Sequence, residues 1–336
     1  MISCLRGAGV EVVERHEPVW EGRRESWRAG AGTAARLAAA QARLARPLPD
    51  CDAVLVGYPG HADLPLARFL ARGRPVVFNP LVSLADTLVG DRGRFGSGSV
   101  AARALAATDR IALRAADVVV ADTEANADFL ARLGDLPRSE VEVCLVGAEE
   151  RVFRPGWSPE EPFTCLFVGK LIPLHGLETI LEAARLAPEL AFRLVGSGQL
   201  EPLVRSRPPN VEWIPWVAYE RLPAELHRCG CALGVFGTSP KAARVIPNKV
   251  FQAIACCAPV VTADTPASRE LLDDGETALL VPPGDPAELA AAVRRLAADA
   301  DLAGRIAAAG RTVFEERASE QVLGERWRSM LERLVA

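Results

Sequence analysis

Short apolar runs alternate with longer amphipathic stretches along most of the chain. In the first half, runs of strand length lie at 53–57, 75–78, 117–121 and 141–146. The stretches between them have apolar residues at helical spacing, at 63–71, 99–115 and 124–133. Strands separated by helices predict an α/β lobe with a parallel sheet and right-handed crossovers.

The same alternation restarts after a segment rich in proline, 154–162, which is the predicted linker. Strands are predicted at 164–168, 191–195, 211–214, 231–235, from 260 and at 278–281. Helices are predicted at 177–186, 220–228, 248–257, 286–298, 301–314 and 320–335. The pattern therefore predicts two Rossmann-like lobes that face a central cleft, with ligands at the carboxyl ends of the strands.

The start of the chain departs from this plan. Residues 2–9 read as the end of a helix with a glycine stop, and residues 10–15 read as a strand. A lobe of this kind normally opens on a strand followed by a glycine-rich turn. We therefore expect either that the true start lies upstream or that the sequence is a fragment.

The chemistry centres on the stretch 238–263. The chain has only three lysines among its 39 basic residues, and two of them, Lys241 and Lys249, flank Arg244 here. Pro247 is suited to the first position of a helix, whose N-terminus attracts anions. The stretch thus predicts a site for a diphosphate, although two rare lysines in one loop can also arise by chance.

Other polar residues follow predicted strands and face the same cleft. Gly169 and Lys170 follow one strand, and His175 and Gly176 precede the next helix. Gly196 and Gly198 follow another strand, but Glu201 breaks the dinucleotide pattern, so a tight turn explains this pair equally well.

In the first lobe, four polar residues lie at or just after strand ends and are candidates for sugar contacts: His61, Asp63, Asn79 and Asp86. For each of these side chains, a role in a loop cap or turn is about as good an explanation.

Composition excludes several classes. The apolar runs are too short to span a bilayer, and the first ten residues lack the pattern of a signal peptide. The eight cysteines have no C-x-x-C pair, so we expect buried thiols, a reducing cytoplasm and no metal. Residues 1–114 carry sixteen arginines and eleven acids, and the excess lies at Arg23, Arg24, Arg28, Arg36, Arg43 and Arg46.

An amphipathic helix with this basic face fits an anionic membrane surface, and a solvated helix face is an equal alternative. Basic and aromatic residues do not interleave as they do in nucleic-acid binders, so we expect no nucleic acid partner.

Several of these segments, taken in order, resemble glycosyltransferase family 4. They are FVGKLIPLHGLE at 167–178, VIPNKVFQA at 245–253, APVV at 258–261 and LVPPGD at 280–285. The resemblance covers about 160–300 and is looser over 53–150. It implies a GT-B fold with an acceptor-side lobe at 1–153, a nucleotide-sugar lobe at 163–315 and a C-terminal helix at 316–336 that crosses back.

The resemblance also implies roles for individual residues. Lys170 falls on a diphosphate contact, and His175 stands where the family has lysine. Gln252 and Arg244 fall on the two glutamates that contact the ribose and the donor sugar, and Asn79 falls on a histidine of the first lobe. Arg244 cannot accept a hydrogen bond at all.

The expected residues form three groups. Catalytic roles are expected for Asn79, Asp86, Lys170 and Lys249. Donor contacts are expected from Gly169, Lys170, His175, Gly176, Gly198, Lys241, Arg244, Ile246, Pro247, Asn248, Lys249 and Gln252. Acceptor contacts are expected from His61 and Asp63.

These residues imply a retaining, metal-independent transferase that uses a nucleotide-diphosphate sugar and an acceptor that is lipid-linked or part of the cell envelope. Two alternatives stay open. One is a bilobal sugar-binding protein, and the other is a degenerate GT-B protein that binds nucleotide without turnover.

Overall fold

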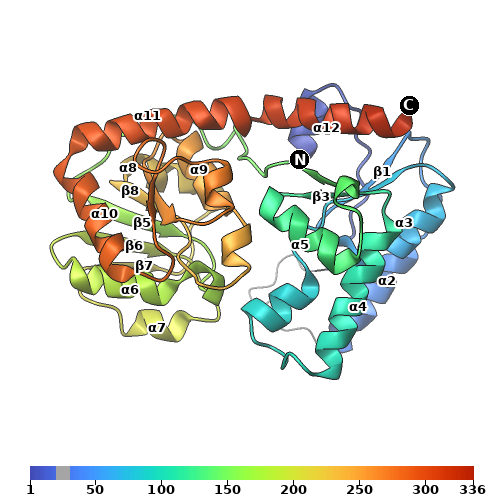
Figure 1. Cartoon of the computed structure of the whole chain (residues 1–336), viewed down its shortest axis with the longest axis horizontal. Coiled ribbons are helices and arrows are strands. Elements are labelled where there is room, and N and C mark those ends of the chain that lie inside the picture. The colour runs from blue at the N-terminus through green and yellow to red at the C-terminus, as the bar shows by residue number, and fades with distance from the viewer. Residues whose placement is uncertain (20–30) are drawn as a thin grey trace.

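The computed structural model describes residues 1–19 and 31–336, and its strands form two separate parallel sheets (Figure 1). The first sheet has the order β1-β2-β3-β4, with strands Val54–Val56, Val76–Phe78, Val118–Ala121 and Val141–Val143. The second has the order β10-β9-β8-β5-β6-β7, with strands Leu279–Val281, Val260–Ala263, Cys231–Leu233, Thr164–Val168, Ala191–Val195 and Val211–Ile214. Residues 144–163 connect the sheets without a helix or strand. The two-lobed α/β architecture predicted from the sequence is confirmed.

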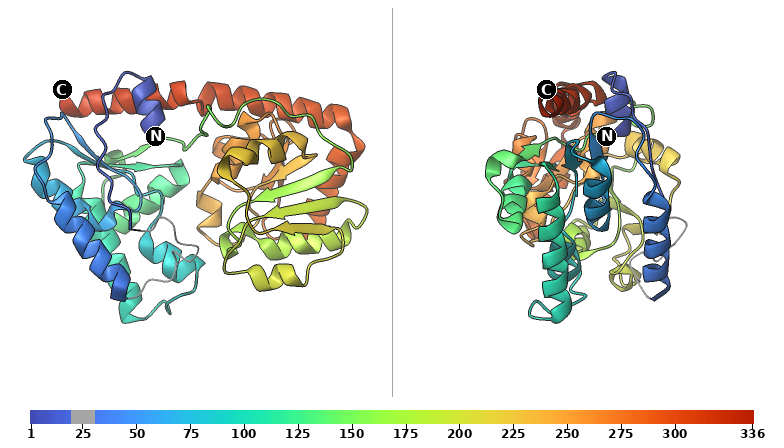
Figure 2. Two further views of the ribbon diagram at one scale, coloured as in Figure 1. Left: turned by 180° about the vertical axis from the view of Figure 1, so that it is seen from behind. Right: turned by 90° about the vertical axis from the view of Figure 1, so that its right-hand side faces the viewer.

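Alternate residues of the first sheet point to opposite faces, and each face has its own core. Phe78 and Val119 pack on the face covered by α3 (Leu64–Ala71), α4 (Val100–Ala115) and α5 (Glu124–Gly134). Val77 and Val120 pack on the opposite face against α1 (Ile2–Gly7) and α12 (Glu320–Val335). Helix α2 (Ala31–Leu44) runs along the outer side of this lobe (Figure 2).

The C-terminal helix therefore belongs to the core of the N-terminal lobe. Helix α11 (Ala300–Arg317) packs on the second lobe, and α12 continues beside it over the first (Figure 1). Gly324 permits the close approach of α1, because a Cβ there would lie 2.3 Å from the carbonyl oxygen of Cys4. The predicted crossover is confirmed, and it ties the two ends of the chain together.

The second lobe also has two cores. Helices α6 (Leu177–Leu186) and α10 (Pro286–Ala298) cover one face, while α8 (Leu222–Arg228) and α9 (Asn248–Ala255) cover the other. Strand β5 lies between β6 and β8, so the strand order reverses on the two sides of it. Ligands of open parallel sheets bind at the carboxyl end of such a strand, which here is Val168-Gly169-Lys170. A short helix, α7 (Glu201–Arg205), follows β6.

A π-helix at Asp86–Asp91 follows β2 and was not anticipated from the sequence. Asp109 on α4 fixes the turn that precedes the π-helix. The carboxylate of Asp109 accepts hydrogen bonds from the backbone N–H groups of Leu84 (2.8 Å) and Ala85 (2.9 Å) in that turn. The hydroxyl of Ser83 donates to the same carboxylate at 2.7 Å. The π-helix lies on the side of this lobe that meets the second lobe, since Asp86 and Thr87 contact residues there.

Two local predictions are wrong, and a third is right except in its first turn. Residues 10–15 form no strand; Val10 and Val12 instead pack against the core beneath α1 and α12, so their alternation reflects packing and not strand pairing. Pro247 precedes α9 instead of starting it, because its ψ of 147° is extended. The predicted helix at 220–228 is a 3-10 turn at Tyr219–Arg221 followed by α8.

Candidate functional site

Gly169, His175 and Lys249 converge at the carboxyl end of β5, as the positions of their segments in the sequence predict. A Cβ placed on Gly169 would lie 2.9 Å from the Lys249 ammonium nitrogen and 3.3 Å from the His175 ring. The Lys249 nitrogen lies 3.7 Å from the centre of the Phe167 ring. It has no hydrogen-bond partner among the residues that the structure describes. Glycine at 169 thus leaves room at a buried cation.

Burial lowers the pKa of Lys249 well below its usual value. An ammonium held over an aromatic face, without a counter-ion, is costly to keep charged. An anion bound beside it would restore its charge. The ammonium of lysine, unlike the guanidinium of arginine, shifts its pKa readily when it is buried.

His175 is oriented by the loop after β5. Its Nδ1 lies 2.5 Å from the backbone oxygen of Lys170, and its ring meets Phe167 edge-on at 5.5 Å. Burial lowers the pKa of His175 well below its usual value, and the nearby charge of Lys249 lowers it further. The imidazole is therefore neutral, with Nδ1–H donating to the carbonyl, and it adds no positive charge to the site.

The predicted glycines serve the packing of these loops. A Cβ at Gly176 would lie 2.5 Å from the backbone of Phe236, and one at Gly198 would lie 2.6 Å from the backbone oxygen of Leu171. The N–H of Gly198 donates to Glu201 at 3.0 Å, which explains the glutamate that breaks the dinucleotide pattern. Gly198 therefore uses its N–H within its own turn.

The other two cations of the central stretch reach across to the first lobe. Lys241 donates to the Thr87 hydroxyl at 2.7 Å, and Arg244 pairs with Asp86 at 2.9 Å. The Arg244 guanidinium also lies 3.9 Å from the centre of the Phe129 ring. Burial lowers the pKa of Lys241, while Asp91 and Asp86 oppose that shift. Lys241 and Arg244 thus bridge the lobes, a role that the sequence did not indicate.

Helix α9 carries the remaining donor-side candidates. Ile246 is buried in the core beneath the helix, while Asn248 is exposed at its first turn. Gln252 and Glu149 both interact with the phenol of Tyr219, whose pKa is raised by its partial burial. Lys170 is exposed beside the Lys249 cluster.

The acceptor-side candidates lie inside the first lobe. His61 is buried, with its Nε2 3.3 Å from the carboxylate of Asp109, and burial lowers its pKa. Gln41 of α2 donates a hydrogen bond to Asp63. Asn79 donates to the backbone oxygen of Val120 at 3.2 Å, which braces β2 against β3. All three side chains have structural partners where the sequence predicted sugar contacts.

Two acids at the contact between the lobes were missed. Glu270 accepts hydrogen bonds from the backbone N–H groups of Glu124 (2.7 Å) and Ala125 (3.0 Å), and so caps α5 from the opposite lobe. Asp122 is buried after β3, and burial raises its pKa to about 6 even though Asn126 donates to it at 2.6 Å. The strand-end rule that selected Asn79 also applies to Asp122.

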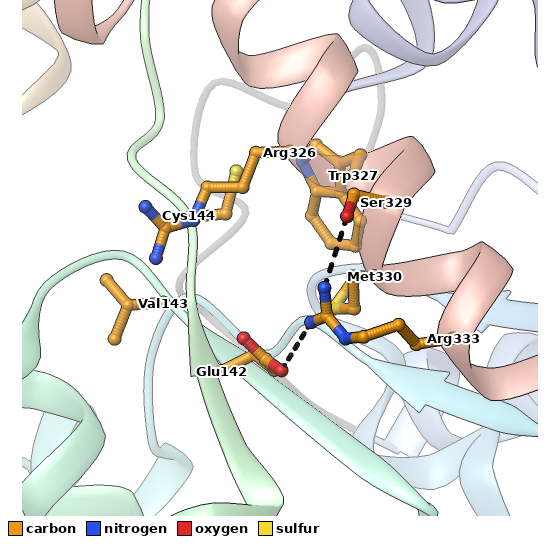
Figure 3. A pocket seen from close by; sticks show the side chains of 8 residues that line it. All are labelled: Glu142, Val143, Cys144, Arg326, Trp327, Ser329, Met330 and Arg333. Atoms are coloured by element: carbon orange, nitrogen blue, oxygen red, sulfur yellow. Dashed lines mark hydrogen bonds and ion pairs between the residues drawn. The ribbon is translucent and has the colours of Figure 1, made fainter.

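Little free space lies beside Lys249 within the second lobe. A pocket of about 10 Å³ lies next to Lys249 and Gln252, enough for about one water molecule. A larger pocket of about 220 Å³ lies between β4 and α12, where Arg333 bridges Glu142 and Ser329 (Figure 3). None of the predicted site residues lines this second pocket. The small pocket is lined only by residues of the second lobe, between its sheet and helices α8 and α9.

Within residues 1–19 and 31–336, no three His, Cys, Asp or Glu side chains are grouped so that they could hold a metal ion. In the same ranges no helix has the length and apolar character needed to cross a membrane. Of the predicted basic face, Arg23, Arg24 and Arg28 lie outside the described residues, and Arg43 pairs with Glu17 at 2.6 Å. All eight cysteines are free, and most are buried, as expected.

Comparison with known families identifies the second lobe. Residues 162–299 match the model of the family described as glycosyl transferases group 1. This lobe is a group 1 glycosyl transferase domain. It contains Lys170, His175 and Lys249, so the buried cation lies inside the matched region.

Curated relatives agree with this. A D-inositol 3-phosphate glycosyltransferase from Nocardioides sp. is 30% identical over 230 residues, which is 58% of this chain and 49% of that protein. An alpha-D-kanosaminyltransferase from Streptomyces kanamyceticus is 25% identical over 217 residues, covering 62% and 55% of the two chains. The chain spans about half the length of the curated relatives that it matches.

Solved structures extend the likeness over both lobes. Sucrose-phosphate synthase from Thermosynechococcus elongatus has a TM-score of 0.72 at 18% identity and covers 90% of this chain and 78% of its own. The HepE protein of Anabaena, solved with UDP and glucose, has a TM-score of 0.69 at 19% identity, with 91% and 84% covered. At such identities the likeness establishes the fold, and that fold is GT-B.

Proposed function

We propose that this protein transfers a sugar from a nucleotide-diphosphate sugar to an acceptor, and that Lys249 binds the diphosphate. The observation that supports this is the buried ammonium of Lys249, which has no hydrogen-bond partner among the described residues and lies beside a glycine at the carboxyl end of β5. A buried cation without a partner costs stability, and a bound anion removes that cost. Relatives named as glycosyltransferases, and a neighbour solved with UDP, favour a nucleoside diphosphate as the anion.

The chemistry follows from where charge develops. When the bond from sugar to diphosphate breaks, negative charge accumulates on the leaving phosphate. Lys249 and the exposed Lys170 supply positive charge at that point, so the proposed reaction needs no metal. Asp86 is held by Arg244, so a direct role for Asp86 requires that the ion pair opens first. We propose that the sugar keeps its anomeric configuration because the acceptor attacks from the face of the leaving diphosphate, as the resemblance to glycosyltransferase family 4 implies.

The acceptor is proposed only as a class. Arginines of the segment 23–46 suit an anionic surface, so we propose a lipid-linked or cell-envelope acceptor reached at the inner face of a membrane. Co-sedimentation with vesicles of anionic and of neutral lipid tests this. Equal partition to both kinds of vesicle would contradict it.

Nucleotide binding comes first among the tests. UDP and GDP are titrated in a thermal-shift measurement, each with and without EDTA. Ligand at about 100 times Kd adds about 2.7 kcal/mol to the stability of the folded state. We expect one nucleotide to stabilise the protein equally in both conditions. A shift that EDTA abolishes would contradict metal independence, and no shift with either nucleotide would contradict the proposal itself.

Turnover is then measured for Lys249→Met, which keeps the aliphatic stem and removes the charge. We expect a loss of roughly 10²–10³ in kcat, the usual effect of removing one preorganised charge-stabilising group. The melting temperature should stay equal or rise, because a buried unpaired ammonium is lost. Arg185→Met, which removes an exposed cation of the same lobe, is the matched control. Binding without turnover in the wild-type protein would favour a degenerate transferase.

A further inference from the structure

Asp91 is a buried carboxylate whose hydrogen-bonding capacity is unused. Its side chain is 1% exposed, and neither oxygen accepts a hydrogen bond from any residue within 1–19 or 31–336. The nearest cation is Arg92, whose Nε lies 3.3 Å from one oxygen in a geometry too poor for a hydrogen bond. A carboxylate normally accepts several hydrogen bonds when it is buried. The burial of Asp91 without hydrogen bonds therefore lowers the stability of the folded protein.

The position of Asp91 connects it to the proposed nucleotide site. It ends the π-helix whose other polar residues, Asp86 and Thr87, contact Arg244 and Lys241 of the second lobe. Asp91 is also the carboxylate that most strongly supports the charge of Lys241. Such π-turns are often found at functional sites. Asp91 thus belongs to the charged contact between the lobes.

Its neighbour Arg92 connects the same point to the Lys249 cluster. Arg92 and Lys241, like Lys249, are close enough to His175 to disfavour its protonated form. The backbone oxygen of Arg92 also accepts a hydrogen bond from Gln199 of the second lobe at 3.4 Å. The unused carboxylate is therefore close to Lys241 of the second lobe, and the residue after it is close to His175.

A sugar at this place needs hydrogen-bond acceptors. The side chains of Lys170, Lys241, Arg244 and Lys249 are donors only, whereas every sugar hydroxyl also donates a hydrogen. Asp86 is occupied by Arg244, and the Thr87 hydroxyl is occupied by Lys241. Asp91 is the acid of the π-helix whose two oxygens both lack a hydrogen-bond partner among the described residues.

We propose that Asp91 accepts hydrogen bonds from hydroxyl groups of the sugar being transferred, and thereby selects neutral, hydroxylated sugars over acidic ones. Two carboxylate oxygens match two adjacent hydroxyls, and bonds to a charged acceptor are the strong ones. A sugar acid would place a second negative charge against Asp91 and would be rejected. This inference rests on the proposed function, since it assigns the sugar part of the same donor.

The test compares a nucleotide with its sugar conjugate. Dissociation constants are measured by calorimetry for UDP and UDP-glucose, or for GDP and GDP-mannose if GDP is the nucleotide that binds. Asp91→Asn keeps the shape and removes the charge. We expect the Kd of the nucleotide sugar to rise about 10- to 100-fold, the usual effect of losing hydrogen bonds to a charged group. The Kd of the nucleotide alone should change by less than about threefold.

Controls separate this effect from general damage. Asp128→Asn removes an exposed, ion-paired carboxylate of the same lobe and should leave both constants unchanged. Wild-type protein should bind UDP-glucuronic acid more weakly than UDP-glucose, and Asp91→Asn should narrow that gap. The melting temperature of Asp91→Asn should stay equal or rise, because an unsatisfied buried charge is removed.

The outcomes are distinguishable. If no nucleotide binds the wild-type protein, the proposed function fails and this inference fails with it. If nucleotide binds but Asp91→Asn weakens nucleotide and nucleotide sugar equally, Asp91 acts on the contact between the lobes and the assignment to the sugar is overturned. An unchanged Kd for the nucleotide sugar in Asp91→Asn overturns it as well.

Discussion

Asp122 shows how one buried acid links pH to stability. Its pKa is about 6 in the folded protein, against an ordinary value of 3.8, mainly because burial disfavours the charged form. The folded state therefore binds a proton more readily than the unfolded state between these two values. Ionised Asp122 costs stability above pH 6, up to about 3 kcal/mol for a shift of this size, and the cost disappears as pH falls toward 4.

Asp122→Asn removes this cost and keeps the acceptor oxygen for Asn126. We expect the variant to gain up to about 3 kcal/mol over the wild-type protein at pH 7.5 and only about 1 kcal/mol at pH 4.5. Urea unfolding at both pH values measures the difference. The same gain in stability at both pH values would mean that ionisation of Asp122 is not the cause. The control is Asp128→Asn, which measures the effect of removing the charge of an exposed acid.

The residues of the site divide by whether their role depends on one lobe or two. Lys249, His175 and Gly169 all lie in the second lobe, either just after a strand or near the start of a helix. The sequence pattern alone therefore brings them together. Lys241 and Arg244 lie in the same stretch, yet their partners come from residues more than 150 positions away in the other lobe. Sequence spacing carries no information about such partners.

At the scale of elements, the π-helix depends on Asp109. Four groups converge on this buried carboxylate: the Ser83 hydroxyl, two backbone N–H groups of the turn before the π-helix, and His61. Asp109→Asn cannot satisfy all of them, because one of its terminal atoms becomes a donor. We expect it to lower the free energy of unfolding by roughly 2–4 kcal/mol.

Chemical denaturation measures that loss, with Asp135→Asn on an exposed ion pair of α5 as the control. If the carboxylate positions the π-helix, Asp109→Asn should also weaken binding of the nucleotide sugar, because Asp91 lies at the end of that helix. A stability loss within 0.5 kcal/mol of the control, about the size of an ordinary surface effect, would show that Asp109 does not hold the turn.

Elements were predicted well where the pattern is long and bounded. Strands β5, β6 and β7 and helices α6, α10 and α12 have the predicted limits, because their apolar runs are flanked by proline, glycine or capping residues. The π-helix was not predicted, since its geometry depends on contacts with α4 that are about 25 residues away in the sequence. The strand predicted at 10–15 failed because alternating apolar residues also suit a segment that packs beneath helices.

At the scale of the whole molecule, two kinds of connection join the lobes. Helix α12 is a permanent connection, because its residues Leu323 and Trp327 are buried in the core of the first lobe. The polar contacts between the lobes can be broken, and among the described residues they include Arg244 with Asp86, Lys241 with Thr87, Gln199 with Arg92, Thr123 with the backbone of Arg244, and Glu270 with the N-terminus of α5. We expect the crossover to act as a hinge and the polar contacts to hold the lobes closed.

Removing two of these contacts should open the ligand-free protein. In Arg244→Ala combined with Glu270→Ala, the ion pair and the cap of α5 are lost together, each worth about 1 kcal/mol. We expect a larger radius of gyration by small-angle X-ray scattering. The radius should fall again when UDP is added, because the diphosphate binds Lys249 and attracts the opposite lobe.

The matched control is Arg269→Ala, which removes a neighbouring ion pair with Asp264 inside one lobe and should leave the scattering unchanged. An unchanged radius in the double variant would mean that apolar contacts hold the closed form. In that case the binding of nucleotide would have to supply the energy that separates the lobes. If opening has to precede binding, nucleotide should associate more slowly with the wild-type protein than with a variant whose lobes separate freely. Its affinity for the wild-type protein should not be higher.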